Sequence, residues 1–221
     1  MTYNPQIHHR RSIRLKGYDY SKKGFYFITM CVQKRKNLFG KFDSVGAALG
    51  GCPNMMLNDA GIMVERWYRE LENKYPDKQC HQMIIMPNHI HYIIENLNVG
   101  IQIDQMDGMD GMDAHVGAPP HGRPLIKHQT NINDNDSKNE KYGFQNIKYN
   151  ATIGDLVDWF KTMTTNEYIR GVKQFDWPRF DGKLWQRNYY EHIIRSTGEL
   201  NRIANYIINN PAKWHNDKFR N

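Results

Sequence analysis

The stretch QMIIMPNHIHYII, residues 82–94, contains two short runs of apolar and β-branched residues separated by a Pro-Asn pair. Apolar runs of this length between turn residues are typical of β-strands, and Pro-Asn favours a turn. The stretch therefore predicts two strands, at 82–86 and 89–94, joined as a hairpin. Because side chains alternate between the two faces of a strand, His89 and His91 should project from the same face, about 7 Å apart along the strand.

The segments on both sides of this hairpin predict further strands and helices. Aromatic and β-branched residues favour strands, and apolar residues repeating at the helical period favour helices. The predicted elements are a strand at 24–32, a helix from Asn58 or Asp59 to Pro76, a helix at 153–170, an extended segment at 184–194 and a helix from Ser196 to Asn210. This order predicts an α+β fold, a ferredoxin-like antiparallel sheet with helices packed on one face.

The segment 98–151 differs in composition from the sequence around it. It contains the near-repeat MDGMDGMD at 106–113 and the polar run NINDNDSKNEK at 131–141. Such a segment has too little apolar surface to offset the entropy that it would lose on ordering. We therefore expect a basic N-terminal arm at 1–23, one folded domain at 24–97 and 152–215, a flexible insertion at 98–151 and a tail at 216–221.

Positive charge gathers at both ends of the chain, which carries a formal net charge of +7. Residues 1–23 hold six Lys and Arg against one Asp, and residues 171–221 hold nine against five acidic residues. A polyanion such as nucleic acid is a natural partner for such ends. The alternative is a solvated basic surface without a specific partner.

The sequence predicts neither a membrane span nor a secretory signal. No run of about 18 apolar residues occurs, and the first residues carry charge without an apolar stretch. The three cysteines lack the spacing of a metal site, and their odd number argues against a disulfide framework. These features favour a cytoplasmic protein.

Two groups of residues suggest chemistry. His89 and His91 on one strand face can supply two of the ligands that a divalent metal needs. On the last predicted helix, Tyr206 and Asn210 are four residues apart and so share one flank, beside an apolar stripe that should hold the helix on the sheet. Taken singly, each group has a plainer explanation: core or surface histidines, a boundary tyrosine and a helix-end asparagine.

Three motifs together carry a family resemblance: MPNHIH at 86–91, WQRNYYEHIIR at 185–195 and YIINNP at 206–211. In this order they resemble the IS200-like transposases, and especially their REP-associated tyrosine transposase branch. The resemblance extends over about 20–97 and 152–215. It implies that this domain is a single-strand DNA endonuclease of the His-hydrophobic-His class with one catalytic tyrosine.

The resemblance also implies a role for each matching residue. His89 and His91 match the metal-binding histidines, Tyr206 matches the nucleophile, and Asn210 matches the third metal ligand. The implied cofactor is Mg²⁺ or Mn²⁺, which would stabilise the charge that develops while the tyrosine attacks the scissile phosphate. The product would be a 5′-phosphotyrosine link and a free 3′-OH, from which strands can be rejoined without ATP. Tyr168 is the main rival nucleophile.

The implied partner is single-stranded or hairpin DNA, at hairpin-forming repeats. The implied location is the cytoplasm, in association with the nucleoid. The implied oligomeric state is a monomer or a homodimer. Basic and aromatic side chains that could contact phosphates or stack on unpaired bases are Arg10, Arg11, Arg14, Lys16, Trp185, Arg187, Tyr189 and Tyr190. Strand alternation would point some of the aromatic residues into the core instead. The alternative function is that of a domesticated DNA-binding protein, which recognises structured single-stranded DNA without cleaving it.

Overall fold

The computed structural model describes residues 14–15, 17–42, 54–97 and 147–220. The predicted DNA contacts Arg10, Arg11 and Lys16 lie outside the described residues, as does most of the predicted insertion. None of the described helices is long and apolar enough to cross a membrane.

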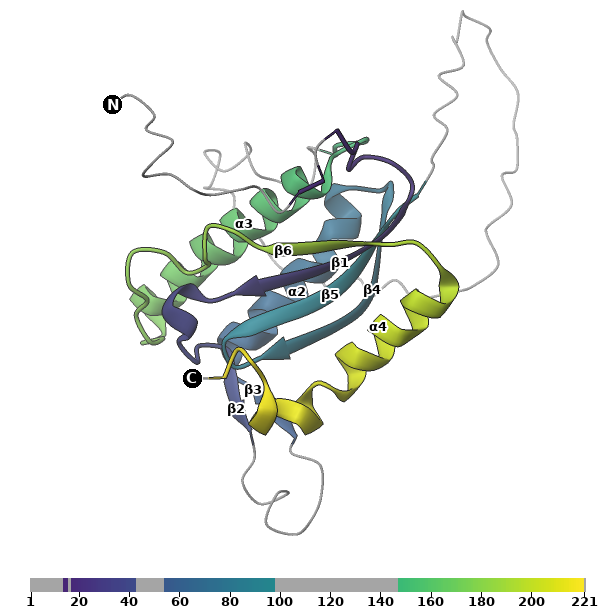
Figure 1. Ribbon diagram of the computed structural model, residues 1–221. Coiled ribbons are helices and arrows are strands. Elements are labelled where there is room, and N and C mark those ends of the chain that lie inside the picture. The colour runs from purple at the N-terminus through teal and green to yellow at the C-terminus, as the bar shows by residue number, and fades with distance from the viewer. Residues whose placement is uncertain (1–13, 16, 43–53, 98–146, 221) are drawn as a thin grey trace, which may run out of the picture. The chain divides into compact units, whose positions relative to one another are not determined.

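The predicted hairpin is present and forms half of a four-stranded sheet (Figure 1). Its strands are β4 (Lys78–Met86) and β5 (His89–Asn96), and β5 pairs on its other side with β1 (Gly24–Cys31). The edge strand β6 (Tyr190–Ile194) pairs with β1. The strand order is β4-β5-β1-β6, and every neighbouring pair is antiparallel.

Helices and a second, smaller sheet complete the described fold. The α-helices are α2 (Asp59–Lys74), α3 (Ile153–Gln174) and α4 (Thr197–Asn209). The smaller sheet and the 3₁₀ helices are formed by β2 (Gly40–Phe42), β3 (Met55–Leu57), η1 (Gln33–Arg35) and η3 (Pro211–Asn216).

The order β1-α2-β4-β5-α3-β6 is that of the ferredoxin-like fold, which confirms the α+β class. α2 and α3 cover the face of the sheet on which Tyr26 and Tyr92 are fully buried. α4 covers the other face, where its Ile203 packs with Phe27 and Ile93. The predicted placement of helices on one face therefore holds for α2 and α3, whereas α4 lies across the opposite face (Figure 1).

Local capping interactions determine where the α-helices begin. The Asn58 side chain accepts a hydrogen bond from the Gly61 N–H at the start of α2. Ser196 accepts one from the Glu199 N–H at the start of α4, as the sequence predicts. At the start of α3, Thr152 forms a full capping box with its third helical residue. Each cap satisfies a backbone donor that the first helical turn leaves without a partner.

Asp77 binds both the segment that leaves the sheet after β5 and the segment that leads back into α3. The Leu97 N–H donates to the Asp77 backbone oxygen, and the Asn150 N–H donates to Asp77 Oδ2, each at 2.8 Å. The buried Lys78 ammonium donates to the same carboxylate oxygen at 2.6 Å. Residues 147–151, which the sequence assigns to the insertion, therefore belong to the folded unit.

Trp185 is part of the core, which corrects its assignment as a base-stacking residue. It is 4% exposed and lies against the rings of Phe39 and Phe160, at centroid distances of 5.2 and 6.0 Å. Its indole N–H donates to Thr164 Oγ1 at 2.8 Å. Its backbone bridges to Val32 just beyond β1, and this pairing directs the indole inward.

We predict that Trp185→Phe lowers the free energy of unfolding by about 2 kcal/mol, because it removes core volume and a buried hydrogen bond. Urea denaturation followed by circular dichroism measures the change. Trp159→Phe, at a half-buried position, should cost less. A Trp185→Phe protein of unchanged stability that had lost DNA binding would contradict the core assignment.

Candidate metal and nucleophile site

His89 and His91 lie next to each other on the face of β5 that α4 covers. Their ring centroids are 4.7 Å apart, His89 is fully buried and His91 is 1% exposed. Ile90 between them points into the core under α2 and α3. The shared face of the two histidines therefore follows from the alternation of side chains along the strand.

Each imidazole is oriented by a hydrogen bond at Nδ1. His89 Nδ1 lies 2.8 Å from Asn88 Oδ1, and Asn88 Nδ2 donates to two backbone oxygens. The atom that faces His89 is therefore an amide oxygen, and His89 Nδ1–H is the donor. His91 Nδ1 lies 2.7 Å from Thr29 Oγ1. His89 Nε2 keeps its lone pair and has no hydrogen-bond partner among the described residues.

The burial of these rings keeps both histidines neutral at pH 7. Burial lowers the pKa of His89 to about 2, and the positive charges of Arg35, Lys218 and, when it is protonated, His91 act in the same direction. Burial likewise lowers the pKa of His91 to about 3, with a contribution from Lys218. A metal binds the neutral imidazole, so no proton has to be displaced from either ring.

Asp217 adds a carboxylate to the two imidazoles. Its Oδ2 lies 3.8 Å from His89 Nε2, and ligand atoms of His89, His91 and Asp217 all lie within 4.8 Å of one another. Two imidazoles and a carboxylate suit a divalent metal ion. Asp217 could not be identified from the sequence, because it stands in the predicted tail and no spacing rule relates it to the histidines.

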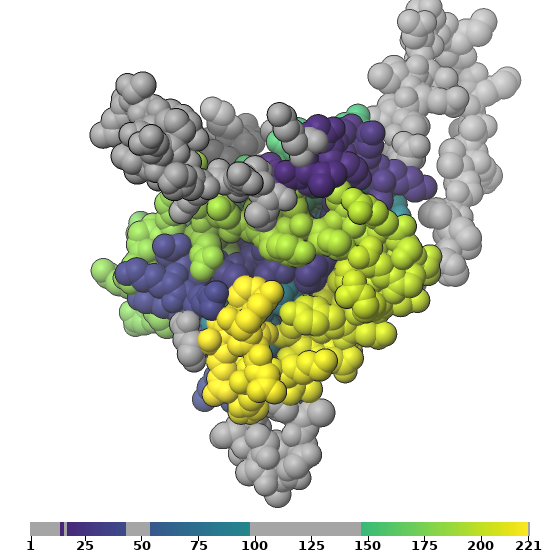
Figure 2. Space-filling model, in the orientation of Figure 1, coloured from purple at the N-terminus to yellow at the C-terminus, as the bar shows by residue number. Residues whose placement is uncertain are grey.

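The C-terminal segment lies over the two histidines, and Figure 2 shows it in yellow on this face of the molecule. The Phe219 ring lies 4.6 Å from His89 and 5.9 Å from His91, measured between centroids. Trp214 stacks over His89 at 6.2 Å and on Phe42 of β2 at 5.4 Å. The predicted tail is therefore a packed wall of the site.

Tyr206 of α4 approaches His91, and Asn210, the residue that caps the end of this helix, interacts with Tyr206. Tyr206 Oη lies 3.4 Å from His91 Nε2, and the tyrosine remains 38% exposed. Asn210 is 2% exposed, and its Oδ1 has no hydrogen-bond partner among the described residues. Burial and the Asp217 charge raise the pKa of Tyr206, whereas a hydrogen bond from Asn210 opposes them. The structure thus brings together the four residues that the resemblance singles out, and adds Asp217.

Tyr168, the rival nucleophile, lies in a different part of the fold. It is a residue of α3 and is fully buried in the core, where its hydroxyl donates to the Pro178 backbone oxygen at 2.9 Å. The rings of Trp177 and Phe180 pack against it. Burial raises the pKa of Tyr168 to about 12. Tyr168 therefore has the environment of a structural tyrosine.

The remaining predicted DNA contacts differ in their environments. The Arg14 guanidinium pairs with Glu191 at 3.4 Å and also contacts the Tyr189 hydroxyl. Arg187 and Tyr190 are exposed, and Tyr190 lies beside Phe27 on the face that carries the histidines. Arg187 and Tyr190 are thus accessible, whereas Arg14 and Tyr189 contact each other.

The low pKa values predict that the metal-free protein loses stability in mild acid. Folded-state values of about 2 and about 3 lie below the ordinary 6.5, so protonation of His89 and His91 favours the unfolded chain. Their contribution is complete above about pH 6.5 and decreases as the pH falls, by up to about 1.4 kcal/mol per pH unit for each ring. Thermal unfolding in chelator at pH 7, 6 and 5 measures the loss.

The double variant His89→Gln, His91→Gln is the control for this measurement, since it has no titrating group at either position. Its stability should depend less on pH over the same range. Equal pH dependence of the two proteins would contradict the assignment of the acid sensitivity to these histidines.

Proteins similar to this chain include a sequence relative and solved transposase structures. No protein-family model matches the chain. Solved structures that resemble it include a REP-associated tyrosine transposase bound to a REP hairpin and a putative transposase from Deinococcus radiodurans. The first is 15% identical, with a TM-score of 0.45 and coverage of 92% of this chain and 74% of that one. The second is 14% identical, with a TM-score of 0.38 and coverage of 89% and 97%.

An uncharacterized protein of Haemophilus influenzae is 34% identical over 216 residues. The match covers 98% of this chain and 96% of the relative, so the two proteins correspond over nearly their whole lengths. The chain belongs to the same family as this Haemophilus influenzae protein.

Proposed function

We propose that this chain is a metal-dependent single-strand DNA transposase or endonuclease. It cleaves and rejoins DNA through a 5′-phosphotyrosine link, and its targets are hairpin-forming repeats. The observation that carries the proposal is the distance of 3.4 Å between Tyr206 Oη and His91 Nε2, in a site where a second imidazole and a carboxylate lie within 4.8 Å. A nucleophile beside a set of metal ligands is the arrangement that phosphoryl transfer requires.

His89, His91 and Asp217 would hold the metal, with Asn210 as a further oxygen ligand. The unpartnered buried atoms His89 Nε2 and Asn210 Oδ1 support this assignment, because a buried polar atom without a partner costs about 1–3 kcal/mol unless a ligand pairs with it. A bound Mg²⁺ or Mn²⁺ would supply Lewis-acid stabilisation of the charge on the scissile phosphate.

Tyr206 would attack the phosphorus through its phenol oxygen. A bond forms between that oxygen and the phosphorus, the bond to the 3′-oxygen breaks, and the 3′-oxygen leaves as a hydroxyl. The phenol loses its proton in this step, and the Asn210 hydrogen bond assists by lowering the pKa that burial raises. The edge contact of the Tyr206 ring with His91, at 5.3 Å between centroids, holds the phenol in this position.

A non-cleaving DNA-binding protein is the second candidate. The observation that favours it is the burial of both histidines, 0% and 1% exposed, with the Phe219 ring 4.6 Å from His89. A site closed to a phosphate would bind DNA elsewhere on the surface without cutting it. Metal binding and formation of a covalent adduct separate the two candidates.

We predict that His89→Ala and His91→Ala each weaken Mn²⁺ binding by about 100-fold, because each removes a side chain that would coordinate the metal directly. Isothermal titration calorimetry measures the affinity, and circular dichroism shows that the variants remain folded. We expect Asp217→Ala to weaken binding more than Asn210→Ala, since a carboxylate ligand carries a charge and an amide does not. Unchanged Mn²⁺ affinity in a folded His89→Ala, His91→Ala protein would overturn the metal site.

We predict that Tyr206→Phe abolishes the covalent adduct while leaving DNA binding intact, because it removes only the attacking oxygen. The substrate is single-stranded hairpin DNA from the sequence around the gene, incubated with Mn²⁺. A label at the 3′ end should move with the protein on a denaturing gel, since the tyrosine would hold the 5′ phosphate of that fragment. A label at the 5′ end should appear in a shorter, free strand.

Tyr190→Phe is the matched control, because this exposed tyrosine lies on the same face of the sheet. It should retain the adduct, as should Tyr168→Phe. An adduct formed by the Tyr206→Phe protein would refute the assignment of the nucleophile. Binding without an adduct in wild type, at any metal concentration, would favour the non-cleaving candidate.

A further inference from the structure

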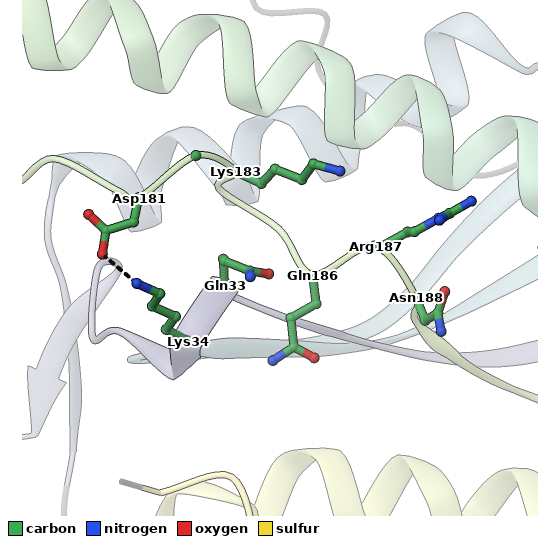
Figure 3. Close-up of a pocket in the computed structure, with 8 residues that line it drawn as sticks. Gln33, Lys34, Asp181, Lys183, Gln186, Arg187 and Asn188 are labelled. Carbon is green, nitrogen blue, oxygen red and sulfur yellow. Dashed lines mark hydrogen bonds and ion pairs between the residues drawn. The ribbon is translucent and has the colours of Figure 1, made fainter. Parts of the chain in front are cut away.

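A cavity of about 590 Å³ lies beside the segment 181–188 that leads into β6 (Figure 3). From this cavity we infer a second DNA subsite, one that binds an unpaired base close to the scissile phosphate. The inference rests on the proposed function and extends it to a group that reads the base. The lining side chains that would act are Gln33, Lys34, Lys183, Gln186, Arg187 and Asn188.

The cavity contains amide groups available for hydrogen bonding. The side chains of Gln33 and Asn188 make no hydrogen bond to any described residue. Gln186 Nε2 donates only a long bond, of 3.4 Å, to the Val32 backbone oxygen, which leaves its Oε1 available. Glutamine and asparagine amides pair with base edges, most characteristically with adenine, to which they can donate and accept together.

The rim of the cavity is positively charged. Lys183 and Arg187 are exposed, and neither side chain forms an ion pair or hydrogen bond with another described residue. Figure 3 shows both extending from the 181–188 segment. The Lys34 and Lys36 Nζ atoms lie 3.3 and 2.9 Å from Asp181 Oδ2. Two ammonium groups share one carboxylate, so the three side chains together carry a net positive charge. Such a rim suits the phosphates on either side of a bound base.

The sheet places this cavity close to the histidines. The Gln186 N–H donates to the Cys31 backbone oxygen at 2.9 Å, and Cys31 is the register partner of His89. Gln186 and His89 are thus separated by two strand spacings, about 10 Å in all. A single strand with its scissile phosphate at the histidines can therefore extend a neighbouring base into the cavity.

Two features fix the shape of the cavity, one on the wall formed by the 181–188 segment and one on the wall that contains Lys34. The Lys161 ammonium of α3 donates to the backbone oxygens of Gln186 and Arg187, at 2.9 and 3.0 Å. On the opposite wall, Lys34 lies in the left-handed region with φ 57°, as does the next residue, Arg35, with φ 52°. Non-glycine residues adopt this region at an energetic cost and concentrate at functional sites.

The test is a comparison of binding to bases and to phosphates. Fluorescence anisotropy measures the affinity of the full chain for labelled twelve-nucleotide strands of dA, dC and dT, and for an abasic strand with the same phosphates. Wild type should bind the dA strand about tenfold more tightly than the abasic strand. The double variant Gln33→Leu, Gln186→Leu should lose this preference and keep its affinity for the abasic strand. Asn188→Leu should reduce the preference without affecting stability, because the Asn188 side chain makes no hydrogen bond to any described residue.

Two control variants show whether the base preference comes from the cavity or from the exposed surface in general. Gln79→Leu removes an exposed amide from β4, at the opposite edge of the sheet, and should leave the preference intact. Arg187→Ala should weaken binding to all strands alike and make the salt dependence shallower, since it removes a phosphate contact.

The outcomes distinguish this inference from the proposed function. If wild type binds single strands but does not prefer dA to the abasic strand, or if Asn188→Leu and the double variant retain the preference, the base subsite is refuted and the function stands. If wild type binds no single strand, both are refuted.

Discussion

The alternation of side chains along β5 is the constraint on which the rest of the structure depends. Ile90, Tyr92 and Ile94 are fully buried under α2 and α3, and a slip of one residue would move all three to the other face. The same alternation places His89 and His91 opposite them, where α4 and the C-terminal segment enclose the two rings. The hydrophobic core on one face of the sheet thus sets the position of the polar groups on the other.

The site on that second face contains polar atoms that the fold itself does not satisfy. His89 Nε2 and Asn210 Oδ1 are buried without partners among the described residues, although nearly every buried polar group in a folded protein is paired. The Nδ1 atoms, by contrast, are held by Asn88 and Thr29. The fold therefore fixes the orientation of the rings and leaves the ligand-side atoms open, which is the division of roles found around metal-binding histidines.

Features set by neighbours in the sequence could be predicted, and features set by distant contacts could not. The β4-β5 hairpin and the cap at Ser196 involve only nearby residues. The face chosen by α4 depends on the whole sheet, and the approach of Asp217 to His89 joins positions that no spacing rule relates. The position of Trp185 could not be predicted, because an aromatic residue near a motif suits stacking as well as packing, and its burial depends on distant contacts with Phe39 and Thr164.

The two hydrogen bonds that Asp77 accepts, from Leu97 and Asn150, affect which changes of length the protein can tolerate. Because both residues hydrogen-bond to Asp77, Leu97 and Asn150 lie close together regardless of the sequence between them. The spacing of these two ends is therefore set by Asp77 itself, so a change of length between them need not disturb the way in which the domain closes.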